Sequence, residues 1–160
     1  MQVQLKKIRD GRPSLTCVRA DGSRTWSQLH PFFPIHDLTH YAVESVLGFT
    51  EAFFGLIASG WEIEDFAASG AAGRLPPVAI VADGAVGLLA LERATGHRLS
   101  GPEFTEALSH ALAGQGRDAF RRVTEAELLQ IRSLCAAVSA QWTQVPPGET
   151  LELSFVATTA

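Results

Sequence analysis

The stretch PIHDLTHYAVE, residues 34–44, places two histidines four positions apart and a glutamate four positions further on. Residues at this spacing share one face of a helix, so His36, His40 and Glu44 are expected to point the same way. Asp37 directly follows the first histidine. At about 100° of rotation per residue, these four side chains fall within about 100° of one another, opposite the main apolar stripe.

The pattern around this stretch predicts a helix from Pro34 to about Ser59. Its apolar residues recur every three or four positions: Leu38, Ala42, Val46, Phe49, Phe53 and Ile57. Pro34 suits a first helical turn, with Asp37 as N-cap the competing start. Gly48 can divide the segment, and Thr50 is then the expected N-cap of the second half.

Alternating apolar and polar residues before this helix predict three short strands, over residues 3–8, 15–19 and 24–28. Asp21-Gly22 suits the tight turn of a β-hairpin, because glycine adopts positive φ at little cost. Residues 150–156 alternate in the same way, with Leu151, Leu153 and Phe155 on one side. We expect this last strand to join the N-terminal meander.

Further helices are expected over residues 78–95 and 101–112, with Gly114-Gln115-Gly116 ending the second. Another begins at the capping box Thr124-Glu125-Ala126-Glu127. Residues 61–66 suit a short turn or helix, and residues 69–73 a flexible surface loop. The sequence thus predicts one α+β domain, residues 1–160, in which a small antiparallel sheet packs against four or five helices.

The composition of 46% hydrophobic and 19% charged residues in 160 is that of a globular domain. The net charge of -4 is unevenly spread, since residues 25–73 hold six acids, three of the five histidines and no Lys or Arg. The sequence has no cluster of Lys and Arg, so we do not expect a nucleic-acid partner. Residues 78–91 are apolar but too few to span a membrane. The N-terminus suits a strand better than a signal peptide, so we expect a cytoplasmic protein. Cys17 and Cys135 are expected to be free thiols.

Two imidazoles beside carboxylates are the donors of a transition-metal site. The expected metal residues are His36, Asp37, His40 and Glu44. Zinc is the favoured divalent ion, with manganese, iron and nickel as alternatives.

The residue that completes this ligand set is open. Asp37 and Glu44 are both in reach, whereas Glu51 lies about 16.5 Å from His40 along a straight helix and needs a break at Gly48 to fold back. His30 can approach from the linker before the helix.

The spacing resembles the zinc motif HExxH, with an aspartate in place of the glutamate that acts as general base. We therefore do not expect a metalloprotease. Two other interpretations of the polar stripe are a plain solvated helix face and a His–carboxylate pair that does acid–base chemistry without metal. A solvated face normally includes Lys or Arg that pair with acids at i,i+4, and this stripe has none.

HDLTH followed by Glu51 resembles the HDxxH-x11-E signature of the ubiquinone-biosynthesis metal-binding family, with ten intervening residues instead of eleven. That family is essentially helical, whereas this chain begins with predicted strands. The order of an ADGSR turn, a PxHDLxHYxVE helix and a PPGETLEL strand is similar to that of small uncharacterised bacterial proteins. This resemblance implies that His36, Asp37, His40 and Glu44 form the signature.

Two functions follow from these features. The first is a metal-binding protein, with metal-dependent catalysis on a small molecule as one use of the site. The second is a non-catalytic interaction or structural domain, in which Phe32-Phe33 and Phe53-Phe54 bury against a second copy, forming a homo-oligomer, or against another protein.

Overall fold

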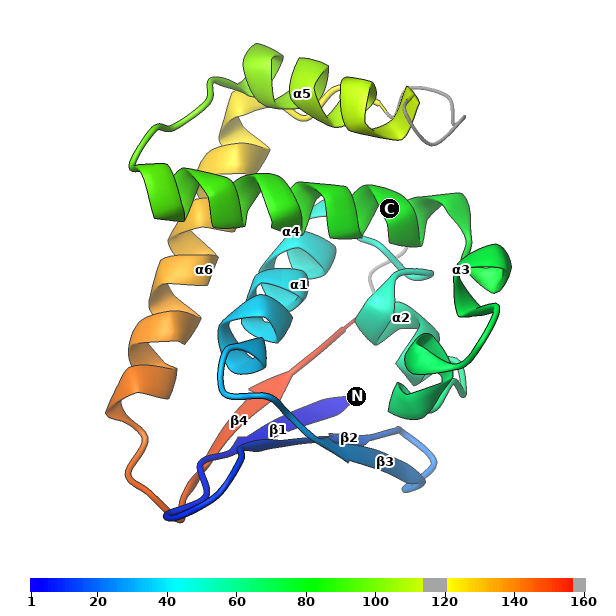
Figure 1. Ribbon diagram of the computed structural model, residues 1–160, viewed down its shortest axis with the longest axis vertical. Coiled ribbons are helices and arrows are strands. Elements are labelled where there is room, and N and C mark those ends of the chain that lie inside the picture. The colour runs from blue at the N-terminus through cyan, green and yellow to red at the C-terminus, as the bar shows by residue number, and fades with distance from the viewer. Residues whose placement is uncertain (114–120, 157–160) are drawn as a thin grey trace.

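The computed structural model describes residues 1–113 and 121–156 (Figure 1). Four strands form one antiparallel sheet in the order β3-β2-β1-β4. They are β1 (Gln2–Lys6), β2 (Ser14–Val18), β3 (Arg24–Gln28) and β4 (Thr150–Ser154). The predicted meander and its pairing with the C-terminal strand are confirmed.

The register of the sheet puts the apolar residues on one face. Leu5 of β1 pairs with Leu15 of β2 and with Leu151 of β4, and Val3 pairs with Cys17. All five side chains are buried, because alternate residues of neighbouring strands point to the same side. The helices cover this face, as Figure 1 shows.

The described residues also form six α-helices and one 3-10 helix. They are α1 (Phe33–Leu47), α2 (Phe53–Ala58), η1 (Ile63–Ala67), α3 (Ala71–Arg74), α4 (Pro77–Thr95), α5 (Gly101–Ala113) and α6 (Glu125–Gln144). Helix α1 packs against α6 and α4, and α5 lies on α4 (Figure 1). Across the described ranges, none of these helices combines the length and apolar character needed to cross a membrane.

The predicted α+β class is confirmed, with more helices than the four or five expected. The expected helix over residues 34–59 is two helices, because Gly48 ends α1 with a left-handed backbone at φ 68°. Ala52, and not Thr50, is the N-cap of α2. Helix α3 also forms where a loop was expected, whereas the predicted stop at residues 114–116 lies outside the described residues.

Helix α1 occupies the middle of the molecule and contributes to two hydrophobic clusters. Val43 packs in a cluster between the helices that includes Phe104 and Ile131. Leu38 packs in a second cluster, between the sheet and the helices, that includes Phe54. Helix α1 is therefore packed on two sides, against the helices and against the sheet.

The start of α6 confirms the predicted capping box. The Thr124 hydroxyl accepts the Glu127 N–H at 3.2 Å, and the Glu127 carboxylate accepts the Thr124 N–H at 2.9 Å. Arg121 pairs with the same carboxylate at 2.9 Å.

Replacing Thr124 by alanine should lower the free energy of unfolding by about 1 kcal/mol, because the Glu127 amide loses its acceptor. Urea denaturation measures this change. Thr143→Ala, at an exposed position inside α6, is the control and should have a clearly smaller effect. Equal losses in both variants would contradict a specific role for the cap.

Candidate metal centre

His36 and His40 lie one turn apart on α1, with ring centroids 4.8 Å from each other. Asp83 reaches the same point from α4, where its Oδ1 lies 3.8 Å from His40 Nε2. Each of the three residues offers one ligand atom, and these atoms lie within 4.8 Å of one another. The crossing of α1 and α4 therefore assembles a group able to hold a metal ion.

The spacing of these atoms is close to that of a coordinated set. Nitrogen and oxygen ligands about 2.0–2.1 Å from a tetrahedral ion lie about 3.3 Å apart. The Asp83 side chain is 74% exposed and so is free to move closer to the histidines, whereas that of His40 is only 7% exposed. Small side-chain movements thus suffice for a shared ion.

Each histidine has a carboxylate at its Nδ1 atom. His36 Nδ1 lies 3.3 Å from Asp37 Oδ1, and His40 Nδ1 lies 3.3 Å from Glu44 Oε1. In the tautomer that donates Nδ1–H to this carboxylate, the Nε2 lone pair is available for a metal. Such carboxylate partners orient the histidines of metal sites and increase their basicity.

His40 is held in the neutral form that a metal ligand requires. Burial lowers its pKa to about 4, and the neighbouring His36 acts in the same direction. Asp37 and Asp83 oppose this shift without cancelling it.

Glu44 joins the site to the fold. Its Oε2 accepts the backbone N–H groups of Phe54 at 2.9 Å and Gly55 at 3.1 Å. It therefore caps α2, whose own N-cap residue makes no side-chain hydrogen bond. Burial raises the pKa of Glu44 to about 8, although the bonds from the amides of residues 53–55 act against this rise.

Gly55 allows this arrangement because the backbone of Thr50 passes directly against it. A Cβ atom at position 55 would collide with the carbonyl group of Thr50. The short turn from α1 to α2 is thus possible only with glycine here.

Asp37 is buried and has one oxygen with no hydrogen bond. Its Oδ1 faces His36, while Oδ2 has no partner within residues 1–113 and 121–156. Burial raises the pKa of Asp37, and the hydrogen bond from His36 partly opposes this. A buried polar atom without a partner is costly, so this oxygen points to a missing interaction.

A cavity of ≈ 650 Å³ adjoins the group, and His36, Asp37, His40 and Asp83 all line it. Much of the remaining wall is apolar and includes Phe33, Phe53, Ile63, Phe66, Leu75 and Ile80. Its size is within the range of about 300–1,000 Å³ typical of small-molecule sites.

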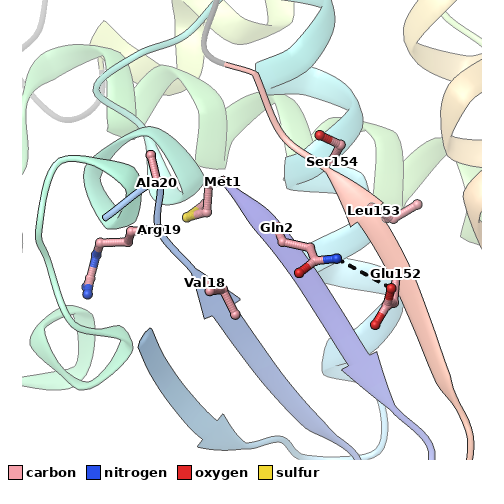
Figure 2. A pocket seen from close by; sticks show the side chains of 8 residues that line it. All are labelled: Met1, Gln2, Val18, Arg19, Ala20, Glu152, Leu153 and Ser154. Atoms are coloured by element: carbon pink, nitrogen blue, oxygen red, sulfur yellow. Dashed lines mark hydrogen bonds between the residues drawn. The ribbon is translucent and has the colours of Figure 1, made fainter. Parts of the chain in front are cut away.

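A second cavity of ≈ 550 Å³ lies away from the histidines, beside β1, β2 and β4 (Figure 2). Arg19 is a cationic side chain at its wall, but its guanidinium group donates to the carbonyls of Ile57 at 2.7 Å and Trp61 at 2.6 Å. Because the fold uses Arg19 in this way, the second cavity is a weaker candidate site.

Of the expected residues, His36 and His40 come together, while Asp37 and Glu44 lie behind them at the Nδ1 atoms.

Glu51 is exposed and outside the group, although the helix does break at Gly48. His30 lines the cavity but stacks on Phe32, with ring centroids 5.4 Å apart.

Asp83 was not predicted as a site residue. The sequence does contain a signal for it, because Asp83 is the only charged residue in the apolar run 78–91.

Two of the four aromatic residues considered as an interface pack within the chain. Phe54 is 1% exposed, and the Phe53 ring packs on His40 at 5.5 Å and on Phe66 at 4.8 Å. Phe32 and Phe33 are exposed, at 81% and 48%.

Comparison of the chain with models of protein families, with curated proteins and with solved structures gives no match. The resemblances based on the HDxxH and PxHDLxHYxVE motifs therefore stay predictions.

Replacing Glu44 by alanine should lower the free energy of unfolding by about 2 to 5 kcal/mol, because two buried amides lose their acceptor. Glu51→Ala is the matched control and should change stability by less than about 0.5 kcal/mol, as the residue is exposed. Chemical denaturation of metal-free protein measures both. Similar values for the two variants would contradict the capping role of Glu44.

Proposed function

We propose that the protein binds one divalent transition-metal ion through His36, His40 and Asp83. The observation that carries this proposal is the convergence of two carboxylate-supported histidines with a third carboxylate at the wall of a cavity. Asp37 and Glu44 are positioning residues, which orient the two imidazoles rather than bind the ion.

The local charge supports a bound cation. Asp37 and Glu44 are buried, and the part of the adjoining cavity wall that the structure describes has no Lys or Arg. Buried carboxylates normally have a cationic partner or lose their charge by protonation. A metal ion held by the two histidines would favour the charged form of both carboxylates.

Two imidazoles and one carboxylate are the three protein ligands of catalytic zinc sites and of the facial triad of non-haem iron. Both arrangements leave coordination positions open. An ion held by these three residues would supply Lewis-acid chemistry to a water or small molecule in the cavity. We therefore propose metal-dependent chemistry on a small molecule, with zinc as the favoured ion.

Protein purified without an affinity tag and loaded with zinc should retain about one equivalent after gel filtration, as measured by elemental analysis. His36→Ala combined with His40→Ala should remove this equivalent. The matched control is His97→Ala combined with His110→Ala, because both of those histidines are exposed and outside the group. Wild type that retains no zinc, manganese, iron or nickel would overturn the proposal.

Asp37→Asn should weaken zinc affinity by about 10- to 100-fold, because asparagine keeps the size of the side chain but not the charge that orients His36. Competition with a chromogenic chelator measures the affinity. Glu106→Gln, which changes an exposed acid on α5, serves as control. An Asp37→Asn affinity equal to that of wild type would show that the carboxylate does not support the site.

A further inference from the structure

The cavity beside the candidate metal centre has an aromatic wall that starts at a metal-binding side chain. The Phe53 ring lies 5.5 Å from the His40 ring, and the Phe66 ring lies 4.8 Å from Phe53. Both phenylalanines line the cavity. A molecule bound to the ion at one end would therefore lay its body against apolar rings.

The charged groups of this cavity are all acidic. Asp37, Glu64 and Asp83 line it, together with the two histidines and His30, and none of the described lining residues is a Lys or an Arg. Among the described groups at this cavity, a carboxylate or phosphate ligand would have no strong cationic partner apart from the ion. It would also be repelled by the nearby acids. Binding sites for such anions normally supply Arg or Lys.

We propose that the ligand of this site is an uncharged organic molecule with an apolar body and a single metal-binding donor atom. The donor occupies an open position on the ion held by His36, His40 and Asp83, and the body fills the space beside Phe53 and Phe66. This inference rests on the proposed metal-binding function and adds the chemical class of the ligand.

Cobalt-loaded protein tests the inference, because the visible spectrum of cobalt(II) reports a change of ligand directly. The probes are 4-phenylimidazole, imidazole and benzoate at pH 7.5. The first two share a neutral nitrogen donor, and only the first has an apolar body; benzoate has the body but carries a negative charge. We expect 4-phenylimidazole to bind at least about tenfold more tightly than imidazole, because its ring is removed from water. It should also bind more tightly than benzoate.

Two variants locate the apolar body. Ala72 lines the cavity and is exposed, so Ala72→Phe should fill part of the space without disturbing the core. Phe66→Ala removes part of the aromatic wall. Each should reduce the preference for 4-phenylimidazole over imidazole by at least about threefold, because less of the phenyl ring is then removed from water. Ala68→Phe, at a nearby exposed alanine that does not line the cavity, is the matched control and should keep the preference.

Equal affinities for 4-phenylimidazole and imidazole, or tighter binding of benzoate, would overturn the inference about the ligand while the cobalt spectrum still supports the metal site. A preference that survives in both Ala72→Phe and Phe66→Ala would also overturn it, because the body would then lie elsewhere. Wild-type protein that takes up no cobalt would overturn the proposed function together with this inference.

Discussion

The buried carboxylate of Glu44 is the interaction on which the centre of the structure depends. One oxygen caps α2 and the other lies 3.3 Å from the Nδ1 atom of His40. Gly48 ends α1, so the chain turns back and brings the first amides of α2 to this carboxylate. The same turn places Phe53 against the His40 ring. A helix cap thus fixes the path of the chain and the orientation of a candidate metal ligand together.

Three of the four residues in the polar stripe of α1 are buried, whereas the His36 side chain is 41% exposed. Asp37, His40 and Glu44 are 4%, 5% and 1% exposed. Helix α4 contacts α1, and Asp83 extends from α4 toward His40. The described residues that line the adjoining cavity include no Lys or Arg, so burial of these acids is unfavourable unless a cation or protons compensate it. This imbalance is the physical reason to expect an ion at the crossing of the two helices.

The elements predicted correctly from the sequence are those set by local rules. The strands follow from two-residue alternation, and the start of α6 follows from the bonds of Thr124 and Glu127, which are three residues apart. The role of Glu44 as a cap for α2 was missed because it depends on a tertiary turn. Asp83 was missed for a similar reason: helical spacing relates residues within α1 and carries no information about which helix crosses it. The pair His36 and His40 was predictable because both lie on one helix.

Anomalous diffraction from zinc-loaded crystals would show whether one ion is shared by helices α1 and α4. Coordination by His36, His40 and Asp83 predicts one strong peak at the zinc edge, about 2.0–2.2 Å from a ligand atom of each residue. The Nδ1 atoms of both histidines should still face Asp37 and Glu44. A zinc peak only at another place, for example at the exposed His97 or His110, and none between α1 and α4 would contradict a shared ion.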